Sequence, residues 1–219
     1  MISRQTNYLK GAITKMKRLF ASVISCVLIL SLICSGLTVF ATTITGAVDT
    51  DNFVRGVDVS TLDMLEDLGA RFYQNNVESD ALTILKNNGA NYVRLKLWVD
   101  PYDENGNPYG GGNNDYATTL ALARRAKNLG MGVLIDFHLS DFWTDPANQI
   151  KPKAWKDLSY SELKTTLYNY MKDTLNNFAA AGIVPEMVQV GNEISTGILH
   201  DDGKVGNGNE DFSNLAGLL

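Results

Sequence analysis

Cysteine and histidine are both scarce in this chain of 219 residues, which contains two of each. Both cysteines, Cys26 and Cys34, lie within the first 41 residues, so the rest of the chain offers no disulfide, thiolate nucleophile or cysteine-bound metal. A metal site formed by His138 with nearby aspartates is disfavoured, because His200 is the only other histidine. We therefore expect no metal or other cofactor in this segment.

Signatures of nucleotide binding are also missing. No Gly-x-Gly-x-x-Gly or Walker sequence follows any of the apolar runs that read as strands, so a dinucleotide or P-loop site is unsupported. The glycine-rich run at residues 110–115 lacks a phosphate-binding lysine and is read as a flexible loop ending in a helix cap.

Positive charge is scarce outside the N-terminus. Residues 1–41 contain five basic residues and no acidic residue; without them, 14 basic residues remain against 24 acidic ones, a formal charge of −10. Such an acidic domain is a poor partner for nucleic acid, whereas a neutral polysaccharide would not be repelled.

The N-terminal segment has the pattern of a targeting sequence. Its basic residues precede an apolar stretch at 19–40 that ends in small residues, which is typical of a secretory signal peptide. The alternative is an uncleaved membrane anchor. We expect a signal peptide at 1–41, a Thr-rich linker at 42–52 and a catalytic domain at 53–219, in a secreted, extracellular protein with no stable membrane association after cleavage.

Beyond the linker, strand and helix patterns alternate. Apolar runs at 53–60, 92–99, 132–139 and 187–190 predict strands buried on both faces, and helices are expected near 80–88, 116–129 and 161–181. Ser159 and Glu162 form a capping-box pattern, and Asp115 is a further N-cap candidate. The alternation predicts an α/β fold with a parallel sheet, either doubly wound or a closed barrel.

Chemically active residue types gather where these strands end. Long loops follow the strands, as expected for functional loops, and the side chains at the four exits are Asp58 and Ser60; Arg94, Trp98 and Asp100; Asp136, His138, Ser140, Asp141 and Trp143; and Asn192 and Glu193.

Structural readings compete with functional ones at several of these positions. Arg94 and Asp136 suit a buried ion pair as well as a substrate contact, and His138 could be a core histidine. Trp143 and Trp155 lie outside the expected regular elements, which favours stacking on sugar rings. Asn192-Glu193 suits glycoside hydrolysis, because the glutamate can protonate a leaving oxygen beside an amide that binds a sugar hydroxyl.

Long ordered segments resemble the glycoside hydrolase family 53 endo-β-1,4-galactanases, also called arabinogalactan endo-β-1,4-galactosidases. The resemblance covers residues 53–219 and rests on the segments Gly-Val-Asp-Val-Ser at 56–60, Asn-Tyr-Val-Arg-Leu-Lys-Leu-Trp-Val-Asp-Pro at 91–101, Gly-Gly-Asn-Asn-Asp at 111–115, Gly-Val-Leu-Ile-Asp-Phe-His-Leu-Ser-Asp-Phe-Trp at 132–143 and Val-Gln-Val-Gly-Asn-Glu-Ile at 188–194.

The resemblance implies a retaining endo-hydrolase with a (β/α)₈ (TIM) barrel, acting on β-1,4-galactan side chains of pectin. It makes Glu193 the general acid/base and supplies the nucleophile from a second glutamate at the end of strand seven. The remaining site residues it implies are substrate-binding: Asp58, Arg94, Trp98, Asp100, His138, Ser140, Asp141, Trp143 and Asn192. Calcium is bound by some bacterial relatives in later loops, whereas the Asp103–Asn107 segment reads as a turn.

Length sets this sequence apart from the family. A complete barrel needs about 250 residues, whereas about 178 follow the leader. We therefore expect about the first four βα units, with a final helix whose Leu215, Leu218 and Leu219 have nothing following to pack against, and no activity in this chain alone. The alternatives are a non-catalytic or defunct galactan-binding fragment, another hydrolase of the same clan such as a cellulase or mannanase, and an aldolase-type barrel.

Overall fold

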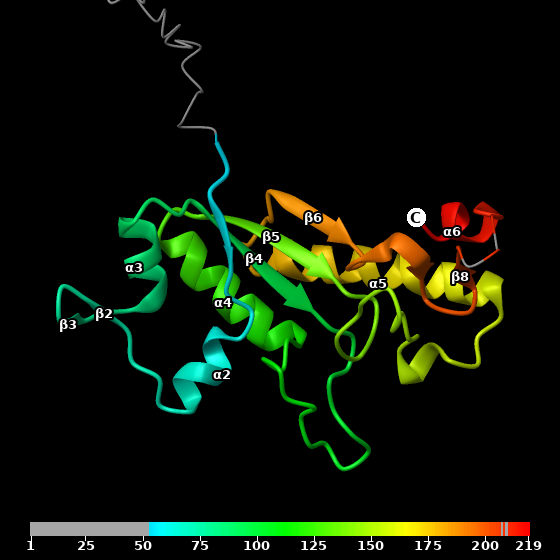
Figure 1. Cartoon of the computed structure of the whole chain (residues 1–219), viewed down its shortest axis with the longest axis horizontal. Coiled ribbons are helices and arrows are strands. Elements are labelled where there is room, and N and C mark those ends of the chain that lie inside the picture. Colours follow the sequence, from blue (N-terminus) through cyan, green and yellow to red (C-terminus); the bar gives the residue numbers. More distant parts are fainter. Residues whose placement is uncertain (1–52, 207, 209) are drawn as a thin grey trace, which may run out of the picture. The chain divides into compact units, whose positions relative to one another are not determined.

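The computed structural model describes residues 53–206, 208 and 210–219 (Figure 1). Residues Val54–Leu219 form one compact unit. The signal peptide predicted for residues 1–41 and the linker predicted for residues 42–52 both lie outside the described residues. Within the described part of the chain, no helix combines the length and the apolar character needed to cross a bilayer.

Four parallel strands form the central sheet. They are β1 (Gly56–Asp58), β4 (Tyr92–Leu97), β5 (Gly132–Phe137) and β6 (Met187–Val190), hydrogen-bonded in that order. The register places Asp58 beside Arg94, Lys96 beside Asp136, and Asp136 beside Gln189. The strands predicted from the sequence and their parallel pairing are confirmed, although β1, β4 and β5 are each shorter than the apolar runs at 53–60, 92–99 and 132–139.

One face of this sheet is apolar and covered by helices. Successive side chains of a strand point to opposite faces, so alternate residues of β4 and β5 point to this face. Leu95 and Ile135 are examples, and both are fully buried. Helices α4 (Tyr116–Asn128) and α5 (Tyr160–Ala180) lie on this face (Figure 1). The Phe137 ring meets Tyr170 of α5 edge to face.

The expected helix signals act as predicted. Asp115 caps α4 through the Thr118 amide, and Asp80, a cap that was not predicted from the sequence, caps α3 (Ala81–Asn87) through the Thr83 amide. The capping box of Ser159 and Glu162 begins α5. Each cap satisfies amides that would otherwise have no partner in the first helical turn.

Several short elements were not predicted. Helix α2 (Leu62–Asp67) and the hairpin of β2 (Tyr73–Gln74) and β3 (Val77–Glu78) lie between β1 and α3. The 3₁₀ turn η1 (Lys153–Trp155) precedes α5, and η2 (Ile194–Thr196) leads into a ladder of β7 (Gly197–Ile198) and β8 (Gly203–Lys204). These elements have fewer residues than a period of apolar residues needs to become recognisable.

The last helix, α6 (Ser213–Leu218), packs against elements that precede it in the chain. Leu215 and Leu218 are buried in the main core, and the Tyr160 hydroxyl at the start of α5 donates to the Asn214 carbonyl at 2.9 Å. These leucines therefore pack backwards onto α5 and β8, while Leu219 remains 61% exposed.

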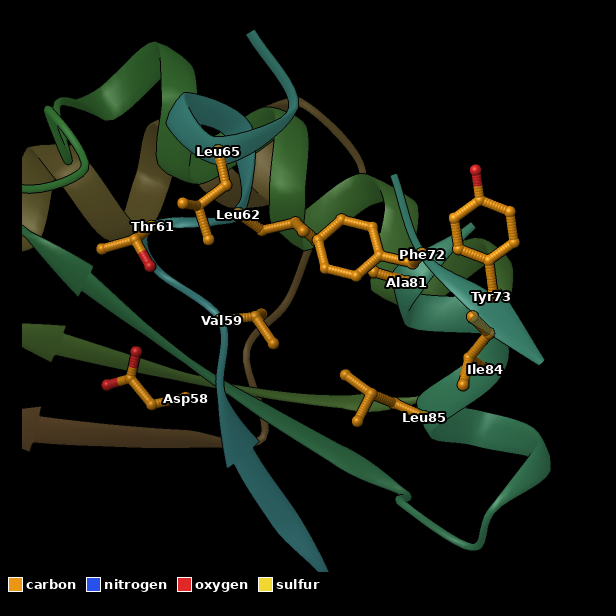
Figure 2. A pocket seen from close by; sticks show the side chains of 10 residues that line it. All are labelled: Asp58, Val59, Thr61, Leu62, Leu65, Phe72, Tyr73, Ala81, Ile84 and Leu85. Carbon is orange, nitrogen blue, oxygen red and sulfur yellow. The ribbon is translucent and has the colours of Figure 1, made fainter. Parts of the chain in front are cut away.

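A hollow of about 310 Å³ lies beside β1, between that strand, α2 and α3. Figure 2 shows Asp58 and Val59 pointing to opposite sides of the chain, with Val59 facing Phe72 and Leu85. The hollow is thus lined mainly by apolar side chains of the helix-facing side, whereas Asp58 points toward the polar face of the sheet.

Candidate active site

The second face of the sheet is polar. The strand register brings alternate side chains from all four strands to this face, near the carboxyl ends of the strands, and these include Asp58, Arg94, Lys96, Asp136 and Gln189. In a parallel α/β protein this edge is where ligands bind.

Arg94 is the centre of the polar cluster. Its guanidinium contacts Asp58 Oδ2 and Asp136 Oδ2, each at 2.5 Å, and donates to Asn192 Oδ1 at 2.9 Å. The Arg94 Nε atom also donates to Gln189 Oε1 at 3.2 Å. One planar cation therefore links β1, β5, β6 and the residue before Glu193.

Asp136 and His138 form the buried floor of this cluster. Both side chains have no exposed surface, and His138 Nε2 lies 3.0 Å from Asp136 Oδ2, with angles outside those of a hydrogen bond. The Thr144 amide donates to His138 Nδ1 at 3.3 Å. Because that amide can only donate, the neutral ring carries its proton on Nε2, facing Asp136. The charge of the buried carboxylate is thus compensated by the Arg94 guanidinium.

Asp58 is tuned by its neighbours to remain ionised. Burial raises its pKa, but hydrogen bonds from Ser60 and the Lys96 ammonium outweigh burial, so the pKa lies below its ordinary value of 3.8. Lys96 Nζ lies 3.0 Å from Asp58 Oδ2 and 4.4 Å from the centre of the Trp143 ring. This ammonium therefore joins the carboxylate cluster to an aromatic side chain.

Glu193 stands at the edge of the cluster with an exposed side chain. It follows β6 through Gly191, whose φ of +78° is accompanied by an Ile194 methyl 2.5 Å from where a Cβ would lie. Glu193 itself has φ of +53°, a left-handed conformation that costs a non-glycine residue of order 1–3 kcal/mol. Among the described residues, its carboxylate has no hydrogen-bond or ion-pair partner, so it is free to meet a ligand.

An aromatic hollow of about 610 Å³ lies beside the cluster. Trp143, 48% exposed, and Phe142, 40% exposed, form part of its wall. Trp143 stacks on His138 with 5.8 Å between ring centres. The buried Trp98 ring packs against both Phe142 and Trp143. Exposed aromatic faces held in this way are suited to stacking on the apolar face of a sugar ring.

Asp141 braces the loops around this hollow. Its two carboxylate oxygens accept from the backbone amides of Asp100 at 3.0 Å and Lys153 at 2.8 Å. Burial raises the pKa of Asp141, which the Lys153 amide and ammonium oppose. The Lys153 ammonium also contacts Asp100 at 2.5 Å. The structure thus gives Asp141 a role in shaping the hollow.

The model for glycosyl hydrolase family 53 matches residues 54–219. The chain belongs to this family. It is 49% identical over 147 residues to "Endo-beta-1,4-galactanase" of Bacillus subtilis (strain 168), a match that covers 67% of this chain and 34% of that protein. It is 42% identical over 166 residues to "Arabinogalactan endo-beta-1,4-galactanase A" of Aspergillus niger, covering 75% and 44%.

Solved structures of family 53 proteins share the fold. The "Ignisphaera aggregans GH53 catalytic domain" superimposes with a TM-score of 0.72 at 49% identity, covering 76% of this chain and 45% of that one. A structure of fungal beta-1,4-galactanases gives a TM-score of 0.67 at 38% identity, covering 75% and 46%. The described α/β unit therefore belongs to the TIM-barrel class, as predicted, and the chain spans less than half the length of these relatives.

The family 53 site residues predicted from sequence fall into two groups in space. The polar cluster contains Asp58, Arg94, His138 and Asn192, with Glu193 at its edge, and it also includes Asp136, which the sequence left open between a buried ion pair and a functional residue. The second group surrounds the aromatic hollow and comprises Trp98, Asp100, Ser140, Asp141 and Trp143. Their roles in binding substrate stay predictions, although Trp98, 1% exposed, is too buried to stack on a ligand and instead packs against Phe142 and Trp143.

One tryptophan was placed wrongly. Trp155 was expected to stack on sugar, but it lies in η1, is 6% exposed and packs edge to face on Tyr170 of α5. The loop that contains Trp155 folds back over α5, and the sequence pattern of a loop does not predict how the loop folds. Trp155 is therefore a core residue.

Sequence reasoning also missed four members of the polar network: Lys96, Thr144, Gln149 and Gln189. Lys96 could have been found from strand parity, since it lies two residues from Arg94 on β4, whereas Gln189 is placed on the polar face by its register partner Asp136 on β5. Thr144 and Gln149 lie in a loop, where no periodicity identifies the inward-facing side chains.

Proposed function

We propose that this family 53 chain contributes the proton-donating half of a retaining endo-β-1,4-galactanase site, which acts on β-1,4-galactan side chains of pectin. The observation that carries the proposal is the exposed Glu193 carboxylate at the carboxyl edge of the parallel sheet, beside an Asn192 held by Arg94. The names of the similar proteins support galactan as the substrate.

Asn192 is oriented for a sugar hydroxyl. Its Oδ1 accepts from Arg94, and one Nδ2 hydrogen is donated to the Thr144 carbonyl at 2.6 Å. A side-chain amide has two such hydrogens, so the second remains for the sugar 2-hydroxyl near the reacting carbon. Contacts to that hydroxyl strengthen as the transition state forms.

Glu193 then acts as general acid and base. It protonates the glycosidic oxygen as the bond to the anomeric carbon breaks, and later takes a proton from the water that releases the sugar. Retention needs a second carboxylate roughly 5 Å away as nucleophile. Asp58 and Asp136 are both bound to Arg94, so we assign the nucleophile to a part of the barrel beyond these four strands.

Two features of the sequence support an extracellular setting. The basic and apolar N-terminal pattern supports secretion, and the acidic remainder of the chain supports a neutral polysaccharide rather than nucleic acid as the partner. A polymeric substrate outside the cell is consistent with both.

Hydrolysis and binding of galactan should be measured together to test the proposal. The 219-residue chain is compared with a chimera in which residues 54–219 are joined to the part of the Bacillus subtilis relative that follows its matched segment. We expect sugar release from β-1,4-galactan by the chimera and none by the chain alone. Binding by both without release would support the non-catalytic alternative, and neither binding nor release would refute the proposal.

A further inference from the structure

Gln149 lies in the loop after β5 and is almost fully buried, with 2% of its surface exposed. Its Nε2 atom donates to the carbonyl oxygen of Asn192 at 2.7 Å and lies 3.4 Å from that of Glu193. It also donates to the Asp145 carbonyl at 3.1 Å. A single buried amide thus binds the two consecutive backbone carbonyls at the turn that carries the proton donor.

The turn needs such support because Glu193 is strained. Its φ of +53° is unfavourable for a residue with a Cβ, and such a conformation persists only where the surroundings over-determine it. A backbone carbonyl that loses its hydrogen-bond donor in the folded protein is left less well satisfied. The Gln149 amide therefore favours the strained turn over conformations in which these carbonyls face elsewhere.

Gln149 is itself held firmly. Its own carbonyl accepts from the His200 amide at 2.7 Å, and Ile150 pairs with His200 in a parallel bridge. One turn earlier, the Thr196 hydroxyl donates to the Pro146 carbonyl at 2.6 Å. The loop at 144–150 is thus fixed to the segment that follows Glu193 on both sides of the amide.

We propose that Gln149 is a positioning residue for proton donation: its buried amide holds the turn at Asn192 and Glu193 and so directs the Glu193 carboxylate. The inference rests on the proposed role of Glu193. Gln149 contacts the backbone of the turn at Asn192 and Glu193 and acts only through it. Replacing Gln149 should therefore slow the step that needs the proton and leave sugar binding nearly unchanged.

The first test reads the turn directly in the full 219-residue chain. Gln149→Met retains the length and unbranched shape of the side chain and removes its donors. Phe178→Leu, a fully buried core change on α5, serves as the control for lost stability. The HN–Hα coupling and the ¹³Cα shift of Glu193, measured by NMR, should move away from left-handed values in Gln149→Met and remain unchanged in Phe178→Leu. Unchanged Glu193 signals in Gln149→Met would overturn the proposal.

The second test uses the chimera with the Bacillus subtilis relative, which we expect to hydrolyse galactan. Gln149→Met should lower kcat on β-1,4-galactan about 100-fold, the cost of a misplaced catalytic group, with KM nearly unchanged. The first bond cleavage of 2,4-dinitrophenyl β-galactoside, followed as the initial burst of dinitrophenolate, should slow less than about 3-fold, because this leaving group needs no proton. Equal losses on both substrates would contradict a positioning role. If no form hydrolyses galactan, the proposed function fails, and the NMR result alone decides the role of Gln149.

Discussion

At the scale of single residues, the site depends on one cation shared among several partners. Arg94 has two carboxylates and two amide oxygens around a planar group that can donate in several directions. Because Asp136 is fully buried, its charge would be uncompensated without Arg94. A buried charge that loses its partner destabilises a fold far more than a broken surface pair does.

Replacing Arg94 should therefore be costly. In urea unfolding of the 219-residue chain, we expect Arg94→Met to lower the free energy of unfolding by about 3 kcal/mol. The matched control is Arg71→Met, which removes an ion pair with Glu78 whose side chains are both more than half exposed, and it should cost under about 1 kcal/mol. Equal losses in the two variants would show that Arg94 is not the centre of the cluster.

The pKa of Asp58 leads to a prediction about acid stability. A folded-state pKa below the unfolded value contributes stability that is present above the unfolded pKa, and that contribution disappears as the pH falls through the folded value. The unfolding free energy of the wild type should therefore fall below about pH 4, and less steeply in Asp58→Asn. Asp141 has a raised pKa and so contributes to the pH dependence of the unfolding free energy with the opposite sign. Because both proteins contain Asp141, its contribution cancels when their pH profiles are compared. Parallel pH profiles would contradict the assignment.

At the scale of elements, β6 combines two functions. Its carboxyl end carries Gly191, Asn192 and Glu193, while its outer edge has no paired strand among the described residues. Val188 of β6 is 40% exposed, although a strand in a parallel α/β sheet is usually covered on both faces. An unpaired edge with exposed apolar side chains is a site for association between chains.

This edge predicts self-association of the isolated chain. Sedimentation velocity over a range of concentrations should show association in the wild type, and Val188→Lys should shift the distribution toward monomer, because a charged edge disfavours strand pairing. Val184→Lys, at a 65% exposed position just before β6, is the control and should leave association unchanged. A wild type that stays monomeric, or an equal response of both variants, would contradict the prediction.

At the scale of the whole molecule, the sequence predicted the parallel sheet, its helices and most strand-end residues. Apolar runs such as Val133–Ile135 and caps such as Asp115 are local signals, and a parallel sheet brings strand ends together whatever the loops do. Three features were not predictable from the sequence: the burial of Trp155, the contact of Lys96 with Trp143, and the hydrogen bonds from Gln149 to the turn at Asn192 and Glu193. Each depends on how a long loop folds back, which no local pattern encodes.

The central claim is that Glu193 donates the proton to the leaving sugar. The most direct measurement compares Glu193→Gln with the unmodified chimera on β-1,4-galactan and on 2,4-dinitrophenyl β-galactoside, since only the first substrate needs a proton donor for bond cleavage. The account predicts that galactan turnover falls at least about 100-fold, while the first bond cleavage of the activated substrate is largely retained. Unchanged turnover of galactan by Glu193→Gln would contradict it.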